Sequence, residues 1–360
     1  MKKLPFSLLL IILGLVLVAC STPFSPASYI QPILAIGPNG ATATPTPFQP
    51  LGVTPTYLPT EIVALGTPNA GGAVDVVISD QSPTNWDTYP GPSVWPDIDI
   101  PPPVGLLPQP KGQVNILLLG SDQRPDTGGF RTDTILLATL NPISGTVNIT
   151  AFPRDLYVYI PGWTAQRINT AFGYGGFESL VTTMEYNFGV RPTHYVLINF
   201  WSFKAVIDSL GGIDVNVATT LTDHRSGYGD YTVWAGVNHM DGETALWYVR
   251  SRYTSNDIDR GRRQQEVLIA IFQKLMSLEA VKRAPELYNI YVNNVTTNLR
   301  FEDAAPLLPL ATQLLDTTRI HRYSVGYEQI VPWVNSSGAQ VLLPIREAVL
   351  VVMRQALNSP

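Results

Sequence analysis

Charged residues gather directly after one apolar run of this chain. The segment GSDQRPDTGGFRTDT, residues 120–134, follows the run VNILLL and carries three acids and two arginines. Only 14% of the chain is charged, and its formal net charge is −5 at pH 7. That acidity argues against a general nucleic-acid binder, which would show a basic face. The cluster therefore indicates a ligand site, and any anion bound there has to be held by local arginines.

The elements around this cluster follow an alternating pattern from Lys111 onward. Short apolar runs predict strands, and apolar residues at helical spacing predict helices between them. The strands are expected at residues 114–120, 132–141, 145–153, 193–200 and 213–218, and the helices at residues 168–189, 203–212, 241–252 and 259–278. Strands mixed with helices predict a layered α/β/α domain with a mixed central sheet flanked by helices.

The ends of two expected strands carry charged side chains. Asp122 and Arg124 follow the strand at 114–120, and Arg154 and Asp155 follow the strand at 145–153. Ligands of α/β sheets bind in the crevice beyond the carboxyl ends of the strands. If the two strands end at the same rim of the sheet, one acid and one arginine from each converge there.

The first twenty residues, MKKLPFSLLLIILGLVLVAC, predict an export signal. Lys2 and Lys3 precede an apolar run that is shorter than the roughly 20 residues a membrane-spanning helix needs. The run ends in LVAC, which resembles a bacterial lipoprotein signal whose cysteine, here Cys20, is lipidated and becomes the mature N-terminus. The alternative is an uncleaved signal anchor. Two lipid chains give stable anchoring, so we expect an extracytoplasmic lipoprotein on the outer face of the cytoplasmic membrane.

Composition divides the rest of the chain into two parts. Residues 21–110 are rich in Pro, Thr and Gly and predict a semi-rigid extracytoplasmic spacer. Residues 111–360 hold the periodic apolar pattern and predict a folded domain. Residues 279–360 are expected to complete this domain, and a separate interaction domain is the alternative. Cys20 is the only cysteine, so the domain is expected to fold without a disulfide.

Several motifs follow one another along the chain in a fixed order. They are GSDQR and RTDT within residues 120–134, then AFPRDLYV, QRINTAF, YVRSR and DIDRGRRQQ. Together they resemble the LytR-CpsA-Psr family, whose members are exported enzymes of bacterial envelope assembly. The resemblance covers the core motifs at residues 114–275 and implies that residues 111–360 form the catalytic domain. It implies a transferase that moves a phosphate-linked glycopolymer from a polyprenyl pyrophosphate carrier to an acceptor, such as a hydroxyl of peptidoglycan. Polyprenyl phosphate is the leaving group.

The resemblance also implies roles for individual residues. Asp122 and Asp133 match the family's metal-binding acids, and the metal implied is Mg²⁺ or Mn²⁺. The residues implied in catalysis are Arg131, Arg154 and Arg252. The residues implied in pyrophosphate binding are Arg124, Arg167, Arg250, Arg260 and Gln264, with Arg167 where relatives often carry Lys. Such groups suit the chemistry, because a divalent cation and arginine forks stabilise the charge that builds up as a pyrophosphate breaks.

Two other functions would use the same residues. A hydrolase that cuts the lipid pyrophosphate with water needs the same metal and arginines, and a binding module would hold the polyprenyl lipid without turnover. The base that deprotonates the acceptor hydroxyl stays open between Asp122 and Asp155. Three arginines that fall outside the matched positions, Arg191, Arg225 and Arg262, are interpreted as solvated residues.

Overall fold

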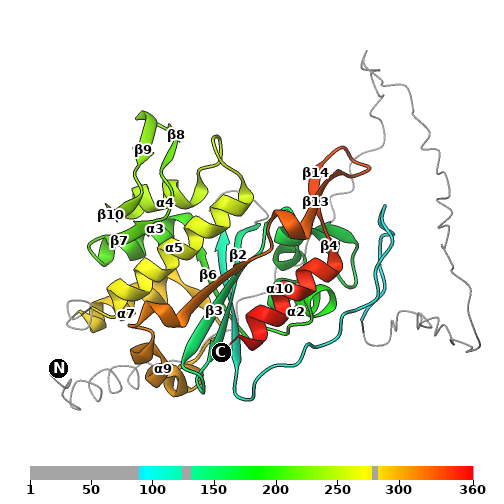
Figure 1. The fold of residues 1–360 in the computed structure, drawn as a ribbon, viewed down its shortest axis with the longest axis horizontal. Coiled ribbons are helices and arrows are strands. Elements are labelled where there is room, and N and C mark those ends of the chain that lie inside the picture. Colours follow the sequence, from blue (N-terminus) through cyan, green and yellow to red (C-terminus); the bar gives the residue numbers. More distant parts are fainter. Residues whose placement is uncertain (1–88, 124–130, 278–282, 360) are drawn as a thin grey trace, which may run out of the picture. The chain divides into compact units, whose positions relative to one another are not determined.

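A computed structural model describes residues 89–123, 131–277 and 283–359 (Figure 1). The main sheet has six strands in the order β11-β6-β1-β2-β3-β12. Their bounds are β1 Val114–Ser121, β2 Thr132–Asn141, β3 Thr146–Ala151, β6 His194–Asn199, β11 Thr296–Thr297 and β12 Ile320–Ser324. β1, β2 and β3 form an antiparallel meander, while β6 runs parallel to β1 and β12 parallel to β3. The predicted mixed central sheet is confirmed.

The apolar run of β1 is buried on both faces of this sheet. Leu117 and Leu119 pack into one hydrophobic core together with Ile135 and Leu137 of β2. Leu118, which lies between them in sequence, packs against a second core on the other side. Alternate residues of a strand point to opposite faces, so an unbroken apolar run requires an apolar layer on each face.

Helices provide those two layers. α2 (Ala171–Phe188) and α10 (Arg346–Asn358) contribute their apolar sides to the first core. α5 (Asp257–Leu275) covers the second core. Figure 1 shows α10 and α2 on one side of the strands and α5 on the other. The layered α/β/α architecture expected from the sequence is therefore present.

A second group of elements has a hydrophobic core of its own. It contains α3 Phe200–Ser209, α4 Gly242–Arg250, β7 Ile213–Val217, β8 Leu221–Arg225, β9 Gly229–Val233 and β10 Gly236–Met240. The strand predicted at 213–218 is β7, which pairs with β10 outside the central sheet. Its burial alternates strictly, because one face packs on this core and the other faces solvent.

Short elements complete the described chain. They are β4 Tyr157–Tyr159, β5 Ala165–Arg167, η2 Ile168–Thr170, α7 Ala284–Asn294, α8 Phe301–Ala304, η3 Ala305–Leu307, α9 Leu308–Gln313, η4 Thr317–Arg319, η5 Tyr327–Gln329, β13 Ile330–Val334 and β14 Gln340–Pro344. β12 joins the central sheet and α10 joins the first core. The C-terminal segment is thus part of the same folded unit.

Residues 89–110, which composition assigned to the spacer, pack against this domain. Tyr89 is buried, its ring lies edge-on to Tyr186 at 5.1 Å, and its hydroxyl donates to Glu185 at 2.9 Å. The backbone N–H of Leu107 donates to the oxygen of Gly189 at 2.8 Å. The folded domain therefore begins upstream of residue 111, because a proline-rich extended segment can still dock through its few apolar side chains.

Within the described residues, no helix is long and apolar enough to cross a membrane. The expected signal, Cys20 and residues 21–88 of the spacer lie outside them.

Candidate active site

A β-bulge places Asp133 at the rim of the central sheet. Gly120 pairs with Thr134, but the next residue, Ser121, pairs with Thr132, so Asp133 has no partner on β1. Bulges of this kind redirect a side chain and are frequent beside active sites. Asp122 follows β1 on the same side, where its Oδ1 accepts the backbone N–H of Arg131 at 2.7 Å. Both predicted metal-binding acids therefore lie at one rim.

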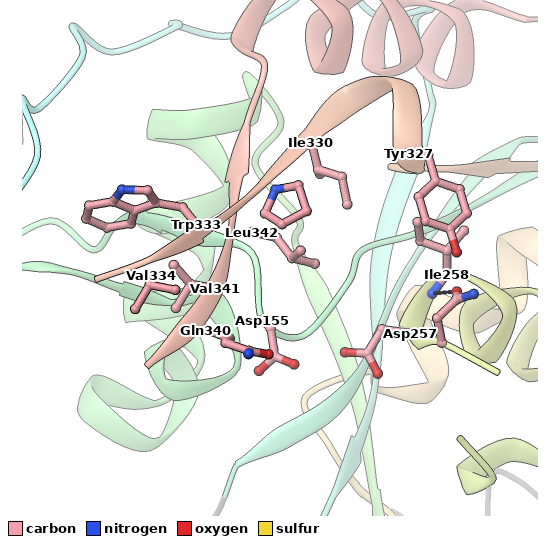
Figure 2. A pocket seen from close by; sticks show the side chains of 12 residues that line it. Asp155, Asp257, Ile258, Tyr327, Ile330, Trp333, Val334, Gln340, Val341 and Leu342 are labelled. Atoms are coloured by element: carbon pink, nitrogen blue, oxygen red, sulfur yellow. Dashed lines mark hydrogen bonds between the residues drawn. The ribbon is translucent and has the colours of Figure 1, made fainter. Parts of the chain in front are cut away.

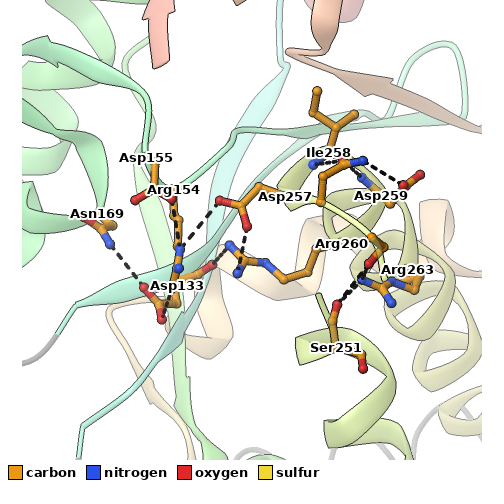
Figure 3. A network of polar contacts seen from close by, with 12 residues as sticks. Asp133, Arg154, Asp155, Asn169, Ser251, Asp257, Ile258, Asp259, Arg260 and Arg263 are labelled. Atoms are coloured by element: carbon orange, nitrogen blue, oxygen red, sulfur yellow. Dashed lines mark hydrogen bonds and ion pairs between the residues drawn. The ribbon is translucent and has the colours of Figure 1, made fainter. Parts of the chain in front are cut away.

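The predicted convergence of β1 and β3 is also found. Both strands are antiparallel to β2, which lies between them, so they end at the same rim. Arg154 follows β3, and its Nη1 donates to Oδ2 of Asp133 at 2.8 Å (Figure 3). The other oxygen of Asp133 accepts from Asn169 Nδ2 at 3.1 Å. Two separate segments thus fix the Asp133 carboxylate.

Arg154 faces three carboxylates. Besides Asp133, its Nε lies 3.4 Å from Oδ2 of Asp155 and 3.6 Å from Oδ2 of Asp257. Burial alone would lower the pKa of Arg154, but the attraction of these carboxylates outweighs it and raises the pKa above its ordinary value. The guanidinium is therefore charged and held in place before any substrate binds.

α5 starts at this rim and adds another arginine. Asn256 caps the helix, its side-chain oxygen accepting the backbone N–H groups of Ile258 and Asp259 at 3.0 Å each. One turn later, Arg260 Nη1 pairs with Oδ1 of Asp257 at 3.1 Å. The helix N-terminus, with its partial positive charge, and two arginines thus lie together at the rim.

α5 is itself tied to the sheet below the rim. The buried Gln265 side chain donates to the backbone oxygens of Ile149 in β3, at 3.0 Å, and Tyr323 in β12, at 2.7 Å. Together these bonds satisfy the buried amide of Gln265 and fix the helix against the strands. Gln264, the predicted binding residue, lies half-buried next to Gln265 on α5.

Arg167 closes the other side of the site. Its Nε lies 3.1 Å from Oδ1 of Asp155, and its Nη2 donates to the backbone oxygen of Gln340 at 2.8 Å. Burial of the Asp155 carboxyl, and then its hydrogen bond with the Asp257 carboxyl, raise its pKa above the ordinary value, against the opposing effect of Arg154 and Arg167. We call the connected residues the rim network; they are Asp133, Arg154, Asp155, Arg167, Asp257 and Arg260.

Two further predicted arginines, Arg250 and Arg252, lie at the end of α4 and just after it; we call residues 250–255 the arginine loop. Arg250 lies over the ring of Phe200, with 4.2 Å between the guanidinium carbon and the ring centroid, and Arg252 is exposed. The loop is held from beneath by a buried carboxylate, because Asp223 Oδ2 accepts the Ser251 hydroxyl at 2.6 Å. Positive charge is thus presented beside the rim network.

The structure brings part of the predicted site together. The rim network contains four of the predicted metal-binding, catalytic and pyrophosphate-binding residues, Asp133, Arg154, Arg167 and Arg260, and also Asp155, a candidate base. Arg124 lies outside the described residues. The role of Asp257 was not predicted, although its spacing of three residues from Arg260 on a helix was a visible signal. Asn169 was missed, since nothing in its local sequence points to Asp133.

One arginine outside the motifs was interpreted wrongly. Arg225 is buried and stacks over the rings of Tyr228 and Tyr231, at 4.4 and 4.6 Å. The stack is a cation–π contact that two tyrosines on the β8–β9 hairpin make possible. Arg191, by contrast, is half-exposed and pairs with Glu178 and Glu185, as expected of a solvated arginine. Arg262 is intermediate and forms an ion pair with Glu266.

The acids at the rim suit a magnesium ion that also contacts phosphate. Among the described residues, no group of three or more His, Cys, Asp or Glu side chains is placed to hold a metal by itself. Mg²⁺ is commonly held by one or two carboxylates together with phosphate oxygens and waters. Asp122 and Asp133 supply such hard oxygen donors on adjacent strand ends.

The fold and the rim network define an α/β protein with a site of arginines and carboxylates at the rim of its central sheet. The family model described as the LytR_cpsA_psr family matches residues 87–348. The chain belongs to this family, and the resemblance found in the sequence is confirmed.

Characterised relatives give the family a biochemical context. The polyisoprenyl-teichoic acid–peptidoglycan teichoic acid transferase TagT of Bacillus subtilis is 33% identical over 225 residues, which are 61% of this chain and 70% of TagT. The corresponding TagU of Enterococcus faecalis is 37% identical over 198 residues, 54% of this chain and 64% of TagU. The match thus spans about two thirds of the length of these relatives.

Solved structures agree with the fold. B. subtilis TagV superposes with a TM-score of 0.56 at 26% identity, over 70% of this chain and 99% of TagV. A structure of TagT bound to LIIa-WTA superposes with a TM-score of 0.54 at 29% identity, over 69% of this chain and 91% of TagT. The predicted fold class is confirmed by these neighbours as well as by the sheet topology.

Proposed function

We propose that this protein transfers a phosphate-linked glycopolymer from a polyprenyl pyrophosphate carrier to a hydroxyl of a cell-wall acceptor such as peptidoglycan. The observation that carries the proposal is the rim network, in which Arg154 and Arg260 converge on Asp133 from two segments of the chain. The names of the relatives TagT and TagU describe the same reaction class, with teichoic acid as the polymer.

The arginines act on the charge that develops during transfer. The acceptor oxygen forms a bond to the sugar-side phosphorus, and the bond from that phosphorus to the bridging oxygen breaks. Polyprenyl phosphate then leaves with the bonding electron pair. Fixed positive groups stabilise this charge without having to reorganise. Arg154 and Arg260 are suited to this role because their carboxylate partners already hold them.

A divalent cation is the second part of the proposal. Asp122 and Asp133 would hold Mg²⁺ or Mn²⁺, and the metal would neutralise phosphate oxygens when bound. The chain's own share is to orient these two carboxylates, which the β-bulge and the Arg131 N–H achieve. Chelation of divalent metal should therefore abolish activity, and added Mg²⁺ or Mn²⁺ should restore it.

Location at the membrane is the third part. A lipidated Cys20 would hold the enzyme on the outer face of the cytoplasmic membrane, where the polyprenyl carrier lies, and a tether raises the local concentration of enzyme there. A Cys20→Ala variant is expected to lose its lipid modification, which mass spectrometry of the purified protein measures directly.

Product analysis tests the proposed reaction. The full chain in detergent is incubated with a labelled, lipid-linked glycopolymer, Mg²⁺ and peptidoglycan oligosaccharides. Label joined to the oligosaccharide supports the transferase. Release of free polymer phosphate at the same rate, with or without acceptor, would instead identify a hydrolase.

A matched pair of variants tests whether the transfer activity depends on the rim network. Arg154→Lys keeps the charge but loses the planar fork, so it should impair transfer. Arg191→Lys makes the same change in an arginine that follows α2 and pairs with Glu178 and Glu185 of that helix, away from the rim, and should transfer normally. Equal activity of both variants would separate the reaction from the rim network.

A further inference from the structure

A cleft of about 640 Å³ opens directly beside the rim network (Figure 2). The β13–β14 hairpin forms its apolar wall through Ile330, Pro332, Val334 and Leu342, and Asp155 and Asp257 line its polar side. We call it the hairpin cleft. Pockets of 300 to 1,000 Å³ with apolar walls and a few placed polar groups are typical of small-molecule sites.

The hairpin is fixed to the segments that carry the rim network. The N–H of Leu342 donates to the backbone oxygen of Asp155 at 3.0 Å, and the Gln340 oxygen accepts from Arg167 at 2.8 Å. At its tip, the N–H of Ser336 donates to Asp97 Oδ2 at 2.8 Å. The cleft therefore keeps a set position relative to Arg154, as a preorganised subsite requires.

The charges of the cleft restrict what it can hold. Asp155 and Asp257 lie on adjacent segments and would repel a phosphate, unlike the arginines on the other side of the rim network. A polyprenyl tail placed against the same carboxylates would strip water from them without offering a hydrogen bond. A neutral, polyhydroxylated ring meets both conditions, since its C–H faces cover apolar wall and its hydroxyls donate to carboxylates.

We propose that the hairpin cleft is the acceptor subsite, which holds a sugar ring of the acceptor glycan with one hydroxyl directed at Asp155. This inference rests on the proposed function. The hydroxyl oxygen forms its bond to the phosphorus held by Arg154, its proton moves to the Asp155 carboxylate, and polyprenyl phosphate leaves. Asp155 contacts Arg154 and Arg167 on one side and lines the cleft on the other. The raised pKa of Asp155 makes it a better proton acceptor than an ordinary carboxylate.

Two valines of β13 provide a matched test. Val334 and Val331 are both exposed on the hairpin, but only Val334 is among the residues that line the cleft in the structure. Val334→Trp should obstruct the cleft, and Val331→Trp should add the same bulk outside it. Both variants should fold, because neither valine is buried in the domain core.

Binding is measured first, without need for turnover. Calorimetry of the full chain in detergent with a soluble peptidoglycan tetrasaccharide should show binding, weakened about tenfold or more by Val334→Trp and little changed by Val331→Trp. No binding to the unaltered chain, or equal binding by both variants, would overturn the proposal.

Kinetics then separate the acceptor from the carrier. Val334→Trp should raise the KM for the acceptor and leave the KM for the lipid-linked carrier unchanged. A raised KM for the carrier alone would overturn the proposal and assign the cleft to the lipid. If the unaltered chain binds the tetrasaccharide but transfers nothing, the proposed function fails while the glycan site stands.

Asp155→Asn tests the proton transfer. This change removes a negative charge beside Arg154 and Arg167, so carrier affinity should stay equal or increase. Transfer should nevertheless fall about 100-fold, as expected when a general base is lost. Full transfer activity in Asp155→Asn would overturn the assignment of Asp155, and parallel losses of carrier binding and transfer would reduce it to a structural residue.

Discussion

The rim network and the arginine loop hold their arginines in opposite ways. In the rim network, carboxylates form ion pairs with the guanidinium groups themselves, Asp133 with Arg154 and Asp257 with Arg260. In the arginine loop, buried residues form hydrogen bonds with the loop backbone, and the side chain of Arg252 is exposed. The comparison indicates that the first region is preorganised for a fixed group of the substrate. The second presents the charge of Arg252 on an exposed side chain.

Two buried charged residues, Asp223 and Arg263, form the hydrogen bonds that hold the arginine loop. Asp223 accepts the Ser251 hydroxyl at 2.6 Å and the N–H of Tyr253 at 3.0 Å. Arg263 donates to the Ser251 backbone oxygen and to the Ser255 hydroxyl, and its burial lowers its pKa. The bonds to Asp223 and to Nη2 of Arg263 fix the loop backbone, although Nε and Nη1 of Arg263 are buried without a hydrogen-bond partner among the described residues.

The largest expected effect is that of Asp133→Asn. The variant weakens both the proposed metal site and the support of Arg154, and we expect kcat/KM for transfer to fall by at least about 100-fold. Asp214→Asn is the control, since Asp214 is an exposed carboxylate that pairs with His239 away from the rim. Comparable activity of Asp133→Asn and the unaltered chain would remove the rim network from the mechanism.

The next test compares one arginine from each region. Arg154→Lys loses a guanidinium held by three carboxylates and should lower kcat/KM about 100-fold. Arg252→Lys keeps the charge on an exposed side chain and should lower kcat/KM about tenfold. Steady-state kinetics with the lipid-linked substrate measures both. The reverse order would show that the arginine loop, and not the rim network, carries the central phosphate contact.

Asp223→Asn should act on the arginine loop without touching substrate. Loss of a buried carboxylate acceptor is expected to lower the free energy of unfolding by about 1–3 kcal/mol. It should also raise the KM for the carrier more than it lowers kcat, because the loop that presents Arg252 loosens. Urea unfolding and kinetics provide the two values. An unchanged KM in a destabilised variant would limit Asp223 to a structural role.

The smallest effect is expected at the surface ion pairs of α2. Arg191 bonds Glu185 and Glu178, and its side chain is 44% exposed. Exposed pairs of this kind contribute about 0–1 kcal/mol. Arg191→Ala should therefore change neither activity nor stability appreciably, which thermal unfolding can check. A large loss would show that the ends of α2 support the rim from a distance.

Strand patterns predicted the rim of the site well, and long-range contacts explain what they missed. Asp122 and Arg154 follow the ends of β1 and β3, and the apolar runs that precede them in the sequence predicted these positions. The bulge that aims Asp133 depends on the register between two strands, which no local pattern encodes. The bond from Asn169 to Asp133 likewise joins residues 36 positions apart.

The hairpin cleft could not be predicted from the sequence, because it too depends on contacts between residues that are distant in sequence. β13 and β14 are short, and their position depends on contacts with β4 and Asp97. Residues 89–110 were misassigned because proline-rich composition describes local stiffness and not the surface against which a segment packs. In both cases tertiary contacts that are distant in sequence decided the outcome.

A crystal structure of the full chain with Mn²⁺ and a polyprenyl pyrophosphate tests the central claim most directly. The account predicts anomalous density for manganese between Asp122, Asp133 and phosphate oxygens. Arg154 and Arg260 should donate to the pyrophosphate. Pyrophosphate bound elsewhere, with Arg154 still paired to Asp133 and no metal at the rim, would contradict it.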